Sequence, residues 1–356
     1  MQSLRSTHPY IRPPKLAPGD KVAAITLSWG GPGSFPHRYA AGKAQLEETF
    51  GVKVVETPHA LVDADWIWRN PRARADDLHE ALLDPTIGAI FSTIGGEESI
   101  RLLPHLDLEL IRSHPKIFMG YSDTTITHFA FLKAGVTSFY GPAIMAGFGE
   151  NGGLFPYMVD AVQRALFSTA PIGEIQPNVG GWTVEHLDWS DPAHQQRKRQ
   201  LQPSTGWNWL QGKGVRRGRL IGGCLEVLDW LRGTNFWPSL EQWRNSILFL
   251  ETSEEAPSPS WVKYALRTLA AAGVLHRVCG ILYSRPGGQI PPARFAEYDA
   301  MLRQVVVDEE GLTELPLITN MDFGHTDPMF VLPYGVLAEI DCETQRFTIL
   351  EAAVEG

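Results

Sequence analysis

The chain has 356 residues, of which 44% are apolar and 20% charged, and this length suffices for two domains that each bury a core. The formal charge of −9 comes from 40 acidic and 31 basic residues without a long run of one sign, which argues against a nucleic acid polymer as partner. Three widely spaced cysteines, no apolar leader and no run of about 18 apolar residues argue against a disulfide framework, export and a membrane span, so we expect a cytoplasmic protein.

Short apolar runs alternate with longer helical segments through the first half of the chain, after a Pro-rich stretch at 1–19 that we expect along the surface. Strands are predicted at 21–27, 52–56, 89–92 and 117–119, and helices at 37–50, 71–83, 97–103, 106–113 and 124–134. This alternation predicts an α/β fold with a mainly parallel sheet covered on both faces. In such sheets ligands collect at the carboxyl ends of the strands.

Ser122 lies on the predicted turn between the strand ending at Met119 and the next helix. A serine on such a turn projects its hydroxyl above the sheet edge, near the free N–H groups of the helix start, as an acyl-transfer nucleophile requires. The simpler alternative is that Ser122 and Asp123 only cap the helix, and Thr124 stands where the esterase-type motif has Gly.

Two adjacent glycines, Gly95 and Gly96, follow the neighbouring predicted strand. Either backbone N–H, together with that of Asp123, would form an oxyanion hole beside Ser122. The alternative is an ordinary Gly-Gly turn.

The segment 141–214 has little regular pattern apart from a predicted helix at 157–167, and it is rich in tryptophan. Its tryptophans are Trp182, Trp189, Trp207 and Trp209. Because linkers favour small and polar residues, we interpret this segment as a lid or binding loop for a flat ligand. The alternative is that these side chains bury a seam between domains or subunits.

A second series of strands and helices completes the chain. Strands are predicted at 218–221, 246–251, 280–283, 315–319, 335–341 and 347–350, and helices at 224–231, 258–272 and 294–307. We therefore divide the chain into an N-terminal α/β domain at 1–170, a Trp-rich connection at 171–217 and a C-terminal α/β domain at 218–356.

A serine nucleophile needs a base, and the base needs an orienting acid. His325 lies after a predicted strand in a loop of Gly, Asp and Pro, where its side chain is able to enter a cleft. Glu226 lies in the first turn of a predicted helix, where the helix dipole favours a carboxylate. A solvated helix residue is the alternative interpretation of Glu226.

Five motifs, by their order and spacing along the chain, resemble the LD-carboxypeptidase family of serine peptidases: TIGGEES (93–99), GYSDTT (120–125), RLIGGCLEVL (219–228), LETSEE (250–255) and DFGHTDP (322–328). The resemblance extends from about 15 to 350. It implies Ser122 as nucleophile, His325 as base and Glu226 as orienting acid, with an oxyanion hole at Asp123 and Gly95 or Gly96. It also implies two domains with the site in the cleft between them, a homodimer, and no metal or organic cofactor.

The family has two branches. The Trp-rich loop and the sequence GGCLEVL resemble the microcin C immunity branch, which implies a small peptidyl- or aminoacyl-nucleotide as substrate. Candidate substrate-binding residues are Trp182 and Trp207 for stacking on a base, and Glu251, Glu254 and Arg285 from their loop positions. The alternatives are the cell-wall branch, which releases terminal D-alanine from muropeptides, and a non-catalytic protein that binds a nucleotide-like ligand.

Overall fold

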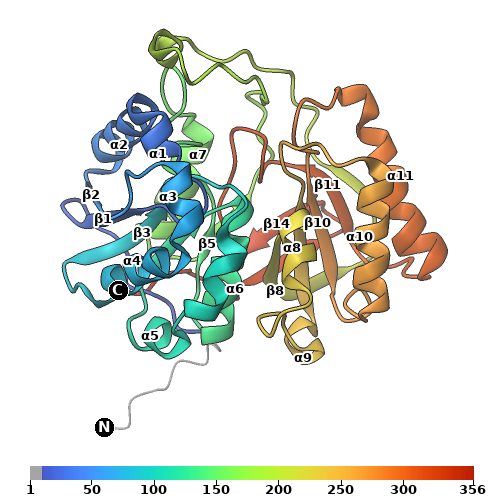
Figure 1. The fold of residues 1–356 in the computed structure, drawn as a ribbon. Coiled ribbons are helices and arrows are strands. Elements are labelled where there is room, and N and C mark those ends of the chain that lie inside the picture. Colours follow the sequence, from blue (N-terminus) through green and yellow to red (C-terminus); the bar gives the residue numbers. More distant parts are fainter. Residues whose placement is uncertain (1–9) are drawn as a thin grey trace.

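The computed structural model describes residues 10–356, and its strands form one sheet in each half of the molecule (Figure 1). Residues 1–9, which hold part of the expected surface stretch and of the segment searched for a leader, lie outside the described residues. Within the described part, every helix is too short or too polar to cross a bilayer. The predicted α/β fold class with two sheet-containing parts is confirmed.

The first sheet has six strands in the order β12-β5-β4-β3-β1-β2. These strands are β1 (Lys21–Ile25), β2 (Lys53–Glu56), β3 (Ile87–Ser92), β4 (Ile117–Gly120), β5 (Phe139–Tyr140) and β12 (Leu332–Pro333). All neighbouring strands are parallel except β12, which runs antiparallel to β5. The parallel strands therefore end at one edge, where the predicted site residues of this half lie.

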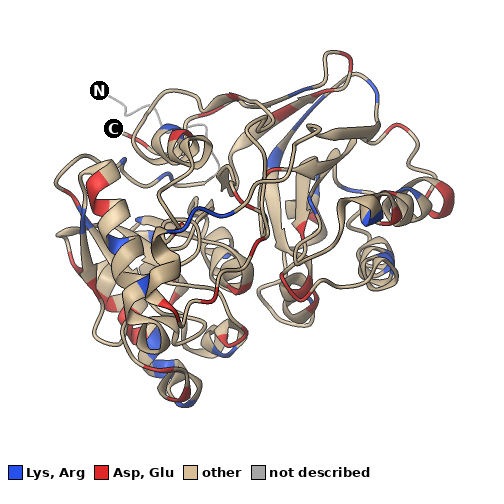
Figure 2. Ribbon diagram, turned by 90° about the horizontal axis from the view of Figure 1, so that it is seen from above, with Lys and Arg blue, Asp and Glu red and all other residues tan. Residues whose placement is uncertain are grey.

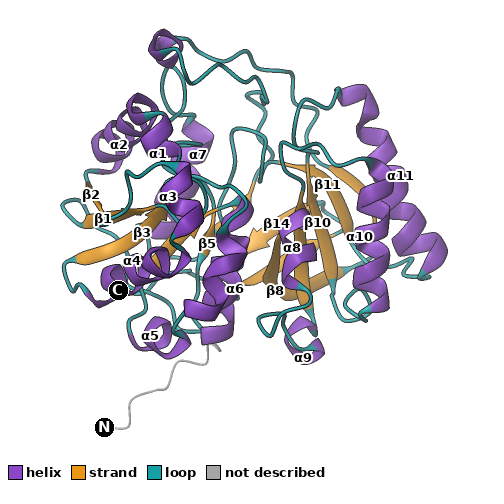
Figure 3. Cartoon of the chain, viewed as in Figure 1, coloured by secondary structure: helices purple, strands orange, loops and turns teal. Residues whose placement is uncertain are grey.

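Helices cover both faces of this sheet (Figure 3), which explains why β3 and β4 are almost entirely buried. They are α1 (Gly31–Ser34), α2 (Pro36–Phe50), α3 (Ala64–Arg69), α4 (Pro71–Leu83), α5 (Leu108–Ser113), α6 (Thr125–Ala134) and α7 (Pro156–Leu166), with 3-10 turns η1 (Ser99–His105) and η2 (Ser122–Thr124). Every residue of α6 except Lys133 is buried, which explains why its sequence shows no amphipathic pattern.

The second sheet has eight strands in the order β6-β14-β13-β8-β9-β10-β11-β7. They are β6 (Gly173–Ile175), β7 (Asn208–Gln211), β8 (Val215–Cys224), β9 (Ser246–Glu251), β10 (Gly280–Ser284), β11 (Leu317–Met321), β13 (Leu337–Asp341) and β14 (Arg346–Ile349). Its centre, β8 to β11, is parallel, and the outer strands pair antiparallel. The remaining helices are α8 (Leu225–Leu231), α9 (Leu240–Trp243), α10 (Pro259–Ala271) and α11 (Phe295–Arg303), with η3 (Pro192–Gln196), η4 (Pro292–Arg294) and the π-helical η5 (Gln304–Glu309).

The two halves exchange segments. Strand β12 comes from the second half of the chain but pairs with β5 of the first sheet. The C-terminal segment returns to the first half, where the Lys15 N–H donates to the Glu355 carbonyl at 2.8 Å. The connection between β6 and β7 reaches back as well, because η3 packs on α2. These crossings hold the first sheet against the second.

Acidic and basic residues are interspersed along the ribbon in both halves (Figure 2). This distribution agrees with the mixed charge pattern of the sequence.

Candidate active site

Ser122 begins η2, directly after the buried strand β4 and Tyr121. Its φ of +64° lies in the left-handed region, as at the tight strand-to-helix turn of a nucleophile elbow. The capping alternative does not hold, since neither η2 nor α6 has a side-chain cap hydrogen bond. The turn therefore presents the Ser122 hydroxyl at the carboxyl edge of the first sheet.

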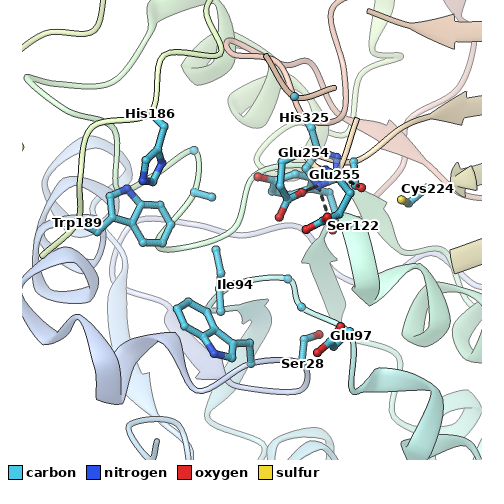
Figure 4. Close-up of a pocket in the computed structure, with 18 of the residues that line it drawn as sticks. Ser28, Ile94, Glu97, Ser122, His186, Trp189, Cys224, Glu254, Glu255 and His325 are labelled. Carbon is cyan, nitrogen blue, oxygen red and sulfur yellow. Dashed lines mark hydrogen bonds and ion pairs between the residues drawn. The ribbon is translucent and has the colours of Figure 1, made fainter. Parts of the chain in front are cut away.

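His325 lies in the loop after β11, and its imidazole lies beside the Ser122 hydroxyl (Figure 4). The His325 Nε2 is 3.0 Å from the Ser122 Oγ. On the other side of the ring, Nδ1 is 2.6 Å from Oε2 of Glu251, the last residue of β9. These distances are those of a hydroxyl, a base and an orienting carboxylate.

The predicted orienting role of Glu226 is wrong. The Glu226 carboxylate accepts hydrogen bonds from the Ser253 N–H at 2.9 Å and the Ser253 hydroxyl at 2.6 Å, and Cys224 Sγ lies 3.5 Å away. Burial raises the pKa of Glu226, and the hydrogen bonds from Ser253 oppose that rise. Its carboxylate thus supports the loop after β9 instead of the imidazole.

Glu251, predicted as a substrate-binding residue, is fully buried and contacts His325 instead. The sequence carried the signal that would have found it, because β9 is a buried parallel strand and Glu251 stands at its carboxyl end. The same rule identified Ser122.

Tyr140, at the end of β5, joins the nucleophile to the acid. Its hydroxyl oxygen accepts the Ser122 N–H at 3.0 Å, and its O–H donates to Glu251 Oε1. Burial raises the pKa of Tyr140 well above its ordinary value, so the hydroxyl keeps the proton that it donates. Sequence reasoning missed Tyr140, because a two-residue strand gives no periodic signal.

Two carboxylates surround His325. Burial lowers the pKa of the imidazole, but the charge and hydrogen bond of Glu251 and then those of Glu254 outweigh it, so the pKa of His325 lies well above its ordinary value. Oε2 of Glu254 is 3.0 Å from Nε2, the nitrogen that also faces Ser122. The hydrogen bond to His325 and its charge lower the pKa of Glu254 to about 2.

The Gly95 turn lies directly against the nucleophile. A Cβ atom at Gly95 would be 2.9 Å from Cβ and 3.0 Å from Oγ of Ser122, and 3.8 Å from the Asp123 backbone nitrogen. Gly96, with φ +147°, turns instead toward Trp29, whose Cβ is 2.8 Å from the corresponding position. The structure therefore brings Gly95 and Asp123 to Ser122, with Gly96 one step away.

A cavity of about 1220 Å³ opens beside Ser122 and His325. Trp29, Phe35 and Trp189 line it as an aromatic cluster, with ring centroids 6.0 Å apart for each neighbouring pair. Figure 4 shows Trp189 and His186 on the side opposite to Ser122, His325 and Glu254. The cavity thus joins a reactive end to an aromatic end.

The predicted stacking residues are wrong. The Trp182 side chain is buried and its Nε1 donates to the Pro203 carbonyl at 3.2 Å, whereas Trp207 Nε1 donates to Asp322 at 2.6 Å. Arg285 is fully buried and pairs with Asp322 at 2.6 Å. None of the three lines the cavity, whereas Glu254 does. Trp29 was missed although it follows the first strand closely, and Trp189 was noted only as one of the loop tryptophans.

Models of the LD-carboxypeptidase N-terminal and C-terminal domains match residues 22–141 and 217–340. A protein of Vibrio cholerae serotype O1 that is named as a carboxypeptidase is 30% identical to this chain, over 96% of this chain and 98% of its own length.

The Microcin C7 self-immunity protein MccF of Escherichia coli is 28% identical over 97% of each chain. Its complex with aspartyl sulfamoyl adenosine matches with a TM-score of 0.81 over 97% of this chain and all of that one, at 27% identity. An MccF-like protein from Streptococcus pneumoniae, solved with AMP, matches with a TM-score of 0.83 and 30% identity over 93% of this chain and 98% of its own.

Proposed function

Because the chain belongs to the LD-carboxypeptidase family of serine peptidases, we propose that it hydrolyses an amide bond with Ser122 as nucleophile, His325 as general base and Glu251 as orienting acid. The observation that carries this proposal is the pair of distances at His325, 3.0 Å to the hydroxyl and 2.6 Å to the carboxylate. Ser122, His325 and Glu251 are called the triad below.

The chemistry follows from these positions. The neutral imidazole, with its proton on Nδ1 toward Glu251, takes the Ser122 proton at Nε2 while Oγ attacks the carbonyl carbon. The oxyanion that forms is stabilised by backbone N–H groups of Asp123 and the Gly95 turn. Nε2 then returns its proton to the leaving amine, the acyl-enzyme forms, and water activated by His325 releases the acid and restores Ser122.

The proposed substrate is an aminoacyl or peptidyl group joined to a nucleotide-like moiety. The aromatic end of the cavity supports it, because Trp29, Phe35 and Trp189 offer ring faces to a base, and stacking of a base on an aromatic side chain is worth about 1–3 kcal/mol. Two solved relatives bind AMP and aspartyl sulfamoyl adenosine. The scissile carbonyl would then lie at Ser122.

The experiment offers purified protein an aminoacyl-sulfamoyl adenosine and a muramyl tetrapeptide in parallel, with products identified by mass spectrometry. We expect the free amino acid and sulfamoyl adenosine from the first compound. Release of D-alanine from the tetrapeptide alone would assign the chain to cell-wall recycling. Binding of either compound without turnover would instead support a non-catalytic binder.

Two sequence-based expectations remain part of this proposal. A homodimer is expected, and light scattering during size-exclusion chromatography measures it directly. A cytoplasmic location is expected, and fractionation of the native host tests it.

A further inference from the structure

The His325 ring has three partners, and their chemistry fixes its protons. Nδ1 faces the carboxylate of Glu251 at 2.6 Å, and Nε2 faces both the carboxylate of Glu254 and the hydroxyl of Ser122 at 3.0 Å. An ionised carboxylate only accepts hydrogen bonds, so both ring nitrogens must donate. The ring is then an imidazolium that has no lone pair for the Ser122 proton. Substrate binding must therefore lead to loss of the Nε2 proton before His325 acts as the base.

The two carboxylates differ in freedom. Glu251 is fully buried and held by the Tyr140 hydroxyl, whereas the Glu254 side chain is 71% exposed on the loop between β9 and α10. Figure 4 shows Glu254 and Glu255 together at the wall of the cavity beside Ser122. Glu254 is thus the carboxylate that is free to leave the ring.

The reactive end of the cavity is acidic. Glu226, Glu254 and Glu255 line it, and within residues 10–356 none of them forms an ion pair with a Lys or Arg. The arginines that line the cavity have other partners. Arg38 donates to Asn151 at 2.6 Å and lies over the Trp189 ring, and Arg199 pairs with Glu150 and, at 2.7 Å, with Asp327.

The remaining groups around His325 do not offset this charge. The Tyr121 ring packs on the imidazole with centroids 4.9 Å apart, and burial raises its pKa well above the ordinary value, so it is neutral. Tyr140 is likewise neutral. A cationic group on the substrate would therefore balance the negative charge at the reactive end of the cavity.

Resting on the proposed function, we propose that the residue supplying the scissile carbonyl carries a basic side chain, lysyl or arginyl, which pairs with Glu254 beside Glu255 and withdraws Glu254 from His325. The imidazolium, having lost one carboxylate, releases its Nε2 proton to solvent and keeps the Nδ1 proton toward Glu251. The neutral ring then accepts the Ser122 proton. Glu254 is in this account a specificity-determining and positioning residue that couples recognition to activation.

The test compares lysyl-, leucyl- and glutamyl-sulfamoyl adenosine as substrates of the full chain, measured as kcat/KM. We expect the lysyl compound to exceed the glutamyl compound at least ~10-fold, since like charges brought together in a site are strongly disfavoured. Equal rates, or a preference for the glutamyl compound, would overturn the inference while leaving the proposed hydrolysis intact.

Matched variants separate the specificity role of Glu254 from its role in controlling the protonation of His325. Glu254→Gln should reduce the lysyl preference and move the acid limb of kcat/KM for the leucyl compound to lower pH. Glu255→Gln should reduce the preference without moving that limb, and Glu97→Gln, which removes a carboxylate near Ser28 in the same cavity (Figure 4), should change neither. An unmoved limb in Glu254→Gln would contradict the coupling of Glu254 to His325.

A failure of the proposed function gives a distinct result. If none of the three compounds is cleaved, calorimetry with Ser122→Ala measures their binding directly. Tighter binding of the lysyl than of the glutamyl compound would support the cationic specificity and would contradict only the hydrolysis. If the lysyl compound binds no more tightly than the glutamyl compound, both the proposed hydrolysis and the proposed cationic specificity are contradicted.

Discussion

Ser122 has a backbone conformation that residues with side chains rarely adopt, at φ +64°. Such a conformation costs of the order of 1–3 kcal/mol and persists only where its surroundings impose it. Here the Ser122 N–H is bonded to Tyr140, and only a glycine fits at Gly95 against its side chain. A residue that merely caps a helix needs neither contact, and this favours the nucleophile over the cap.

The sequence predicts Glu226 as the orienting acid, whereas the structure places Glu251 beside His325, and a pair of variants distinguishes the two. Glu251→Gln should lower kcat by about 10³–10⁴-fold, because an amide at Nδ1 no longer holds the imidazole in the tautomer that accepts the Ser122 proton. Glu226→Gln should lower kcat less than ~10-fold, since its carboxylate bonds Ser253.

Steady-state kinetics on one substrate, with circular dichroism to verify folding, measures both variants. Equal losses in the two, or a larger loss in Glu226→Gln, would return the orienting role to Glu226.

The pKa of His325 predicts the pH dependence. The base step needs a neutral ring, and the pKa of free His325 lies above the ordinary value of 6.5. Therefore kcat/KM should rise with pH through an acid limb centred above 6.5. The stability that the imidazolium contributes has the opposite trend, being complete below the unfolded pKa and lost as pH rises through the folded one. A pH–rate profile with a limb at or below 6.5 would contradict the observed surroundings of the ring.

Among the elements of the site, the turn after β3 packs directly against the nucleophile. Gly95→Ala would place a methyl group 2.9 Å from Cβ of Ser122, so either the turn or the nucleophile must shift. We expect kcat/KM to fall at least ~10²-fold, because displacements near 1 Å at a reacting group have effects of that size. Gly233→Ala is the control, since nothing lies within 4 Å of the added Cβ. Similar activity in the two variants would argue against a constrained turn.

The parallel strands were predictable from the sequence because burial on both faces makes them continuous apolar runs. Strand 246–251 was predicted with the bounds of β9, and Ser122 followed from its place after β4. The short strands β5, β6 and β12 carry too few residues for a pattern, so Tyr140 escaped notice.

Side chains on irregular segments were not predictable in the same way. The directions of Trp182 and Trp207 depend on distant partners, the Pro203 carbonyl and Asp322, that local sequence does not reveal. The resemblance to the family implied Glu226 as orienting acid, but the N–H and the hydroxyl of Ser253 bind its carboxylate, and neither contact is visible in the local sequence. Tertiary contacts thus decided which residues line the cavity.

At the scale of the whole molecule, segment exchange couples the two halves. Strand β12 pairs with β5, and the Glu355 carbonyl bonds Lys15, so neither half keeps its pairing if the other unfolds. We expect one cooperative urea transition, with tryptophan fluorescence and far-ultraviolet circular dichroism giving coincident midpoints. Two separated transitions would show that the halves unfold independently.

The same coupling brings the triad together, with Ser122 supplied by the first half and Glu251 and His325 by the second. If Ser122 and His325 act as one unit, their losses are not additive. The decisive measurement is kcat for the wild type, Ser122→Ala, His325→Ala and the double variant on a single cleaved substrate. We predict that each single variant loses at least ~10³-fold and that the double variant is no slower than either. Losses that multiply in the double variant, or a single variant within ~10-fold of the wild type, would contradict the triad.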